Sequence, residues 1–334
     1  MKTWMFFPAF LLGACLLSAQ DLPTPGSLFA KPGTKNSTPT RGIGIEYERH
    51  PNYEMEGGAD EAGNNLVNDV ERRERMEARI GIPFILKDNF RVLGTLYHSR
   101  ERYVFSDLDP SNFAFQAIDN TTLKRGRATL HVLGSLGEHH YLAFRGDISS
   151  NGAYEKFVDF DSRYLVYRGA VAFGFKRRDG YEDLAFGLMY SNGFARNLVY
   201  PFIVYDRTFD DRWGIETLLP LKASLRYNFS PTNMLLLTSE YRSFAYSLDL
   251  MPNGATDPQH YIFKSSGVQF YLDWQSRFLT SLTWFSLRTG YAWNFDSRFF
   301  LEGTKDGGQI DAFPSGSIFV AAEFFLSPPQ KDNY

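Results

Sequence analysis

Charged side chains recur at every second position of several otherwise apolar stretches of this 334-residue chain. Within residues 213–229, Glu216, Lys222 and Arg226 occupy even positions, and most odd positions are apolar. Because successive side chains of a β-strand point to opposite faces, each stretch would present one polar and one apolar face. The polar faces select the basic residues Arg79, Arg125, Arg127, Arg145, Arg168, Lys222, Arg226, Arg242 and Arg288, and the acidic residues Glu46, Glu77, Asp147, Asp183, Glu216, Glu240, Asp273 and Glu323.

These two sets of charges nearly cancel. Unpaired charges in a narrow, low-dielectric interior would be costly, so near-balance predicts ion pairs between neighbouring strands that fill the interior. A strongly anion- or cation-selective pore should carry an excess of one sign along a ladder. We find no such excess in the sequence and expect no strong selectivity.

The sequence shows no set of residues with the pattern of a catalytic site. A serine nucleophile needs a base at hydrogen-bond distance and a group that orients the base. Ser191, in Tyr190-Ser191-Asn192-Gly193, has no histidine directly before it and no nucleophile motif after it. We therefore expect no catalytic residue.

Metal ligation is not predicted either. His139-His140 lies at an expected turn, and neighbours on a strand point apart, so this pair would chelate poorly. We interpret all six histidines as exposed or interfacial. The acidic residues Glu54, Glu56, Asp60 and Glu61 lack the regular spacing of a calcium loop. No metal and no cofactor are expected, and a formal net charge of -3 gives no electrostatic reason to expect nucleic acid.

The elements that would position the charged residues are strands. Period-2 alternation is clearest in residues 76–86, 184–191, 213–229, 268–275 and 317–326. No apolar run of about 18 residues follows the N-terminal segment, which excludes helical membrane spans. Aromatic residues make up 16% of the chain, yet its mean hydropathy is -0.30. An aromatic chain that is polar on average fits a transmembrane β-barrel, whose strands place only every second side chain on lipid.

Short and long connections alternate along the chain. The short turns are 87–89, 134–138, 177–181, 230–233 and 276–281, and the long polar connections are 50–72, 102–122, 151–161, 192–212, 247–262 and 299–313. Membrane barrels have short periplasmic turns and long external loops, so the pattern predicts twelve antiparallel strands with both termini in the periplasm. A soluble β-sandwich is the alternative fold, but it gives no reason for this alternation.

The strand count depends on one region. Residues 198–205 could form an extra strand, but that strand would split 213–229 into two pieces too short to span a membrane. We therefore predict twelve strands, with ten or fourteen as alternatives. The apolar residues 194–205 would then belong to the fourth long connection, and either fold inward as a constriction or extend a strand above the membrane.

The N-terminus resembles a secretory signal peptide. Lys2 precedes an apolar stretch, residues 4–17, and small residues follow it. We predict a signal peptide at 1–20, a flexible periplasmic lead-in at 21–40, a barrel at 41–326 and a tail at 327–334. Cys15, the only cysteine, lies in the leader, so a mature chain without it would have no disulfide; lipidation of Cys15 is the alternative.

Several stretches together resemble a family of predicted outer-membrane β-barrel proteins of unknown function, of a Gram-negative, Bacteroidetes-like type. They are Ile80-Gly81-Ile82-Pro83-Phe84-Ile85-Leu86-Lys87 with Arg91-Val92-Leu93-Gly94, Trp213-Gly214-Ile215-Glu216 with Leu218-Leu219-Pro220, Arg226-Tyr227-Asn228-Phe229-Ser230, Leu287-Arg288-Thr289-Gly290-Tyr291, and the closing stretch 319–325. The resemblance implies an architecture and a location but no activity. One departure is that Pro328-Pro329 separates the terminal aromatic Tyr334 from the last strand.

The sequence thus predicts an integral outer-membrane β-barrel that is a small, restricted passive pore or a structural or surface protein. Its expected partners are outer-membrane lipid, the barrel-assembly machinery and small solutes. A barrel that binds a ligand through external loops is one alternative, with Phe105, Phe113, Phe115, Tyr154 and Phe157 as the contact residues. A lipid-modifying hydrolase of the outer membrane is the other.

Overall fold

The computed structural model describes residues 34–58, 66–109, 111–177, 179–192, 194, 197–252, 255–302 and 309–327. The signal-peptide prediction, Cys15, Asp60, Glu61 and residues 328–334 lie outside this part of the chain. The strands are β1 (Ile43–Gly57), β2 (Leu66–Leu86), β3 (Phe90–Asp107), β4 (Thr122–Leu136), β5 (His140–Gly152), β6 (Leu165–Lys176), β7 (Glu182–Asn192), β8 (Asn197–Thr208), β9 (Trp213–Leu219), β10 (Lys222–Ser230), β11 (Asn233–Leu250), β12 (Gln259–Arg277), β13 (Thr283–Leu301), β14 (Ile310–Pro314) and β15 (Ser317–Leu326). Two short helical segments, α2 (Phe113–Ile118) and the 3₁₀ turn η2 (Ser162–Tyr164), lie between strands. Neither is long and apolar enough to cross a bilayer.

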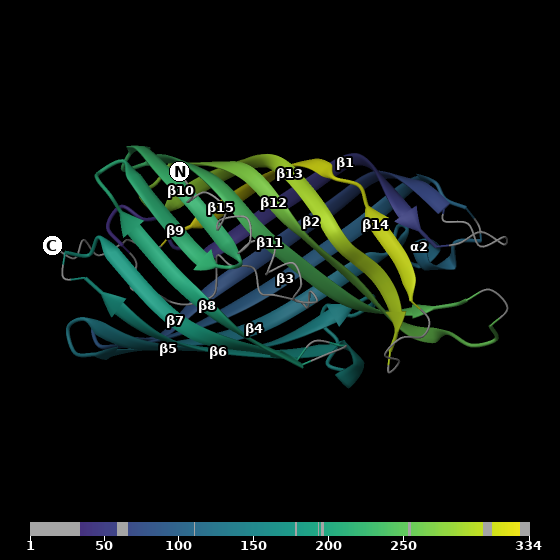
Figure 1. Ribbon diagram of the computed structural model, residues 1–334, viewed down its shortest axis with the longest axis horizontal. Coiled ribbons are helices and arrows are strands. Elements are labelled where there is room, and N and C mark those ends of the chain that lie inside the picture. Colours follow the sequence, from purple (N-terminus) through teal and green to yellow (C-terminus); the bar gives the residue numbers. More distant parts are fainter. Residues whose placement is uncertain are drawn as a thin grey trace, which may run out of the picture.

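Strands neighbouring in sequence pair antiparallel from β1 to β13, and the sheet closes on itself as a barrel (Figure 1). β14 and β15 are successive pieces of one wall position, because both pair with β1 and with β13. The barrel therefore has fourteen strands. Ile43 pairs with Leu326, so the barrel begins and ends at the same end, which we call the lower end.

The prediction of an all-β antiparallel barrel is confirmed, and the strand count is the alternative of fourteen rather than the favoured twelve. Residues 213–229 form the hairpin β9–β10, and residues 198–205 lie within β8. Pro220 has no N–H to donate to a ladder, and the Leu221 amide donates to the Leu218 carbonyl to close the turn (2.6 Å). Leu218 pairs with Lys222, four residues on, so odd and even positions keep their faces through the turn. The odd–even alternation of residues 213–229 is therefore the same as that of one long strand, although the chain reverses at the turn.

The predicted inward constriction is corrected as well. Residues 197–208 form a wall strand whose Val199 and Pro201 are exposed and whose Tyr200 and Phe202 are buried. They pair with β7 along their whole length.

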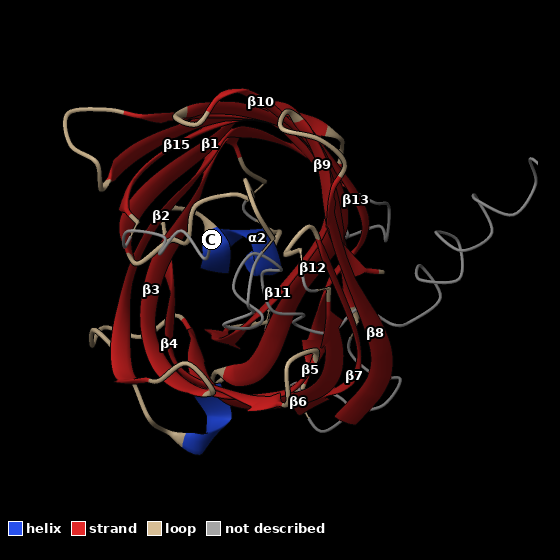
Figure 2. Cartoon of the chain, turned by 90° about the vertical axis from the view of Figure 1, so that its left-hand side faces the viewer, coloured by secondary structure: helices blue, strands red, loops and turns tan. Residues whose placement is uncertain are grey.

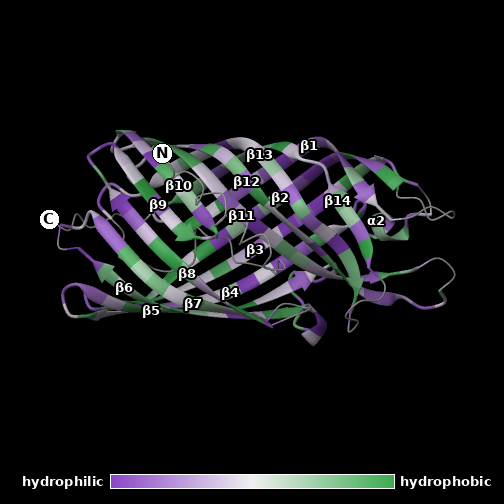
Figure 3. Cartoon of the chain, in the orientation of Figure 1, coloured by the Kyte–Doolittle hydropathy of each residue, from purple (hydrophilic) through white to green (hydrophobic). Residues whose placement is uncertain are grey.

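Large apolar side chains cover the outer face of the barrel. On β2, Met76, Ile80, Ile82, Phe84 and Leu86 are all exposed, and they lie within eleven consecutive residues. At about 3.4 Å per residue and a tilt of about 45°, these residues span roughly 25 Å, the height of the apolar band of membrane barrels. Figure 3 shows the matching alternation of apolar and polar positions along the strands. An exposed apolar band of this extent is typical of barrel walls that face lipid, and we call it the lipid-facing band.

The barrel narrows toward its other, upper end. β9 and β10 are only 7 and 9 residues long, whereas β11 has 18. Above this short hairpin, β11 meets β5 instead: Ser247 pairs in parallel with Gly152, and the Ala153 amide donates to the Ser247 carbonyl (3.1 Å). A Cβ at Gly152 would lie 2.8 Å from the Ser247 carbonyl oxygen, so this close approach depends on a glycine. The upper ring thus omits β6 to β10.

An apolar core fills the narrow upper ring. Phe115, Ile118, Phe263 and Phe299 are fully buried in it, and the rings of Phe263 and Phe299 stack at 4.6 Å. The helix α2 contributes Phe115 and Ile118, and the Asn112 side chain caps it by accepting from the Phe115 amide. Viewed along the barrel, α2 lies within the outline of the wall (Figure 2). The upper part of the interior is therefore filled by side chains.

Candidate functional site: the charged interior

Below the apolar core, ion pairs cross the interior of the barrel. The Arg75 guanidinium on β2 lies 3.1 Å from Glu48 and 3.0 Å from Glu77. Arg242 on β11 reaches the same Glu48 on β1 at 3.2 Å, although β12, β13 and the β14–β15 position separate these strands in the wall. Arg288 pairs with Glu46. The pairs of Arg242 with Glu48 and of Arg288 with Glu46 join strands that are not neighbours, so these two pairs link separate parts of the wall.

The structure places the seventeen predicted interior residues as follows. Thirteen are buried, namely Glu46, Glu77, Arg125, Arg127, Arg145, Asp147, Arg168, Asp183, Arg226, Glu240, Asp273, Arg288 and Glu323. The other four, Arg79, Glu216, Lys222 and Arg242, are half-buried. Most are joined in local pairs, such as Arg79 with Glu323 at 2.6 Å and Arg226 with Glu216 at 3.1 Å.

Sequence reasoning missed several interior charges. The prediction omits Arg73, Arg75 and Glu101. It assigns residues 50–72 and 102–122 to connections and therefore makes the adjoining strands too short to include these three residues. In the structure β2 runs from Leu66, so its alternation extends well above the lipid-facing band. The parity that Arg73 and Arg75 share with Glu77 was the usable signal. Arg41 precedes β1 and carried no such signal.

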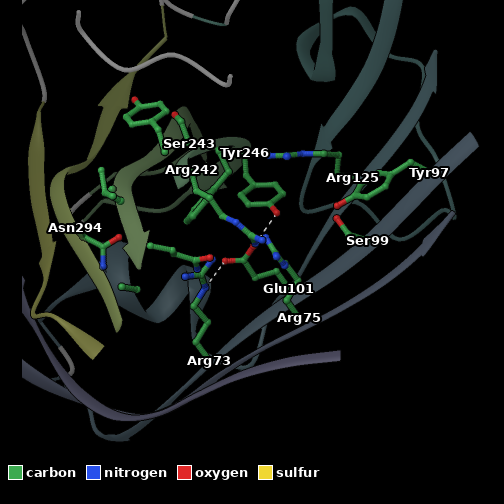
Figure 4. Close-up of a pocket in the computed structure, with 16 residues that line it drawn as sticks. Arg73, Arg75, Tyr97, Ser99, Glu101, Arg125, Arg242, Ser243, Tyr246 and Asn294 are labelled. Atoms are coloured by element: carbon green, nitrogen blue, oxygen red, sulfur yellow. Dashed lines mark hydrogen bonds and ion pairs between the residues drawn. The ribbon is translucent and has the colours of Figure 1, made fainter. Parts of the chain in front are cut away.

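A small cavity lies in the middle of the interior (Figure 4). Arg73, Arg75, Arg125 and Arg242 line it together with one carboxylate, that of Glu101. Glu101 accepts hydrogen bonds from Arg73 Nε (2.7 Å), Tyr103 Oη (2.9 Å) and Tyr246 Oη (2.9 Å). The cavity volume is about 30 Å³, which is room for little more than a water molecule. The cavity itself is therefore too small to hold a solute much larger than water.

A segment that precedes β1 crosses the lower mouth of the barrel. We call residues 34–41 the strap. The Thr38 amide and hydroxyl both donate to the Glu216 carboxylate on β9, at 2.9 and 2.7 Å. Arg41 donates to Glu323 on β15 at 2.9 Å and lies 3.7 Å from Asp273 on β12. Thr208 Oγ1 donates to the Lys35 carbonyl (2.6 Å). The strap thus joins both sides of the mouth.

The residues considered for covalent or metal chemistry are separated in space. Ser191 is fully buried, and its Oγ has no hydrogen-bond partner in the described part of the chain, so no base activates it there. Among the described residues, no group of three or more His, Cys, Asp or Glu side chains could hold a metal ion. The interpretation of all histidines as exposed or interfacial is wrong for His50 and His131. Both are buried, and His50 contacts Glu48 (3.0 Å) and Ser317 (2.8 Å) because its strand continues above the lipid-facing band.

The loop aromatics predicted to contact a ligand mostly pack into the protein. Phe105 and Phe115 belong to the upper apolar core, and Phe113 packs against it. Tyr154 is buried beside Tyr164, and burial raises the pKa of both phenols. Of the five residues, Phe157 alone is largely exposed. Phe105, Phe113, Phe115 and Tyr154 therefore stabilise the upper end, and only Phe157 among the five presents an exposed ring.

Comparison with known proteins supports the family predicted from sequence. The profile of the family described as "Domain of unknown function (DUF6268)" matches residues 44–300, which confirms the predicted resemblance to a family of unknown function. No curated protein matches the chain.

Solved structures similar to this chain include three bacterial proteins. One is the COG4313 outer membrane channel of Pseudomonas putida F1, at 13% identity over 91% of this chain and 100% of that chain, with a TM-score of 0.46. Another is a FadL homologue of Pseudomonas aeruginosa, at 10% identity over 92% and 99%, with a TM-score of 0.46. The third is the toluene transporter TodX of Pseudomonas putida, at 9% identity over 92% and 96%, with a TM-score of 0.38.

Proposed function

The chain belongs to the family of "Domain of unknown function (DUF6268)", and we propose that it is an outer-membrane channel: a passive pore for small polar solutes that is closed in the conformation described. The observation that carries the proposal is the arrangement of the wall. A closed barrel exposes an apolar band outside and encloses a charged interior. A protein that served only to fill a membrane would gain nothing from a charged interior, because burying charges is costly even when they are paired.

Three features close the proposed pore. The upper core is packed with aromatic side chains, the middle is crossed by ion pairs, and the strap lies over the lower mouth. The middle and lower barriers are polar and are made of single side chains or a short segment. Water can replace such contacts at modest cost, so they are the barriers most readily rearranged. We propose that opening displaces the strap and the central ion pairs.

Location follows from the same reasoning. We propose that residues 1–20 direct export, that the lower end faces the periplasm and that the barrel-assembly machinery inserts the chain. The short connections at the lower end and the position of Ile43 and Leu326 there support this orientation. No catalytic step is part of the proposal.

Conductance of the refolded mature chain in a planar bilayer tests the proposal, with heat-dependent mobility in a detergent gel as the folding check. We expect rare, small unitary openings for the natural chain and more frequent openings when residues 34–41 are deleted. Folded protein that stays silent in both forms, at any voltage that the bilayer tolerates, would refute the channel. It would leave a filled barrel whose function lies elsewhere.

A further inference from the structure

One part of the interior wall is strongly basic although the interior as a whole is nearly balanced. Arg125 and Arg127 on β4, Arg145 on β5 and Arg168 on β6 are all buried. The only carboxylate among the inward residues of this patch is Asp147 on β5. We call these four arginines the arginine patch. Four positive charges therefore face one negative charge on three adjacent strands.

The strand register brings these side chains together. Arg127 pairs with Ser149, and Asp147 pairs with Arg168. On β5, Arg145 is the next inward residue below Asp147. On β4, Asp147 faces Thr129, and Arg127 is the next inward residue above Thr129. The sequence could not show this excess, because Arg125 and Arg127 precede Asp147 by about twenty residues and meet it only across the β4–β5 hairpin.

Asp147 is already engaged by two members of the patch. Its carboxylate lies 3.0 Å from Arg145 Nη2 and 3.3 Å from Arg168 Nη1. Arg127 has no comparable partner. Its guanidinium lies over the Tyr97 ring at 4.5 Å, and within the described chain it donates no hydrogen bond and forms no ion pair; its nearby anion, Asp147, acts on it only at longer range and is already paired with Arg145 and Arg168. Yet only 8% of Arg127 is exposed.

A second polar group beside Arg127 also lacks a partner. Ser149, opposite Arg127 in the β4–β5 ladder, is 1% exposed, and its Oγ has no hydrogen-bond partner in the described structure. Buried polar groups are nearly always satisfied, and a buried cation without an anion is costlier still. An arginine and a hydroxyl that both lack a partner on one rung point to a ligand that accepts hydrogen bonds.

We propose that the arginine patch binds a small oxyanion, a carboxylate or phosphate group, with Arg127 and Ser149 as its direct donors. Planar guanidinium groups match such oxyanions in geometry and charge. The patch continues into the central cavity through Arg125, whose guanidinium lies over the Tyr246 ring at 5.5 Å (Figure 4). An anion that leaves the cavity would therefore meet the patch next. Binding itself does not require conduction, whereas a preference of the pore for anions rests on the proposed function.

Thermal unfolding of the refolded, detergent-solubilised chain tests binding directly. We expect inorganic phosphate to raise Tm above the value in chloride at equal ionic strength. The substitution Arg127→Gln should raise the half-saturating phosphate concentration about tenfold or more, since it removes a hydrogen bond to a charged group. In low-salt buffer without phosphate, Arg127→Gln should raise Tm, because it removes an uncompensated buried charge.

The matched control is Arg79→Gln, which removes an interior arginine that is paired with Glu323 at 2.6 Å. This variant should keep the response to phosphate. Equal Tm in phosphate and chloride for the natural chain would overturn the site, as would an unchanged response in Arg127→Gln. Formate in place of phosphate separates the two kinds of oxyanion, because a patch shaped for planar carboxylates would respond to formate at lower concentration.

Reversal potentials across a KCl gradient distinguish the two proposals. Anion preference that is lost in Arg127→Gln supports a role of the patch in passage. Conduction without ion preference would remove that role and leave the pore. A silent bilayer would refute the pore, while the Tm shift would still decide whether the patch binds an oxyanion.

Discussion

Weakening the strap by the double substitution Thr38→Ala and Arg41→Ala should release it from the lower mouth. Two side-chain hydrogen bonds to carboxylates are lost, from Thr38 Oγ1 to Glu216 and from Arg41 Nε to Glu323. The backbone amide of residue 38 remains in the variant and keeps its own bond to Glu216. At about 1.5 kcal/mol for each partly exposed, charge-assisted bond, the loss is about 3 kcal/mol. This changes the ratio of bound to released strap by roughly 150-fold.

The carboxylates left behind do not complicate this estimate. Glu216 keeps Arg226 at 3.1 Å, and Glu323 keeps Arg79 at 2.6 Å. Asp273 loses Arg41 at 3.7 Å but keeps hydrogen bonds from Ser286 Oγ (2.6 Å) and Gln275 Nε2 (2.7 Å). No carboxylate is therefore left without a partner, and the barrel itself should stay folded. The effect is confined to the strap.

A cysteine at position 37 provides the assay. Ser37 is half-buried within the strap, and the predicted mature chain has no other thiol. Maleimide labelling of Ser37→Cys should speed up by about two orders of magnitude in the double variant, because labelling follows the released population. Thr40→Ala, at an exposed position of the same strap, is the matched control and should leave the rate unchanged. Equal labelling rates in the double variant and in the control would refute the assignment of the strap as a fixed closure.

Two further substitutions test the wall. Gly174→Ala should lower the free energy of unfolding by about 1–3 kcal/mol in urea titrations, because its Cβ would lie 2.0 Å from the buried Tyr141 ring, whereas Gly134→Ala, with 3.9 Å to its nearest neighbour, should stay within experimental error of the natural chain. Leu237→Lys, on the outer face of β11 and 57% exposed, should cost about 2–4 kcal/mol for folding into lipid vesicles, whereas Leu279→Lys, in the lower turn and 87% exposed, should cost less than about 1 kcal/mol; equal costs would contradict the lipid-facing assignment.

The sequence predicted the class of the fold because side-chain parity alone decides which face of a strand is apolar. It favours twelve strands over the alternative of fourteen, since the turn at Pro220 preserves that parity and hides a reversal of the chain. The lengths of β9 and β10 also favour the lower strand count, because pieces of 7 and 9 residues are short for strands that span a membrane. The barrel tolerates them because β11 closes against β5 above the hairpin.

The interior charges were largely predictable, but their partners were not. Parity identified Arg242 as an inward residue, yet its contact with Glu48 joins positions 194 residues apart. Such a contact depends on the curvature of the closed wall, and no local pattern encodes it. Contacts within one hairpin, such as that of Arg168 with Asp147, follow from the register and are readable once the turn is known.

Charge balance in a barrel is a local property. A sum of charges over the whole interior therefore does not show whether one part of the wall carries an excess of one sign. Interaction energy falls with distance, so a charge several strands away contributes less than one on a neighbouring strand. An acidic residue on β12 therefore does little for an arginine on β4. The near-cancellation of all interior charges argued against selectivity when the sequence was considered alone, because it averaged over the whole wall. Once the register places Arg127, Arg145 and Arg168 around Asp147, with Arg125 one inward position above Arg127, the relevant count is the one within that patch, and there it is far from zero.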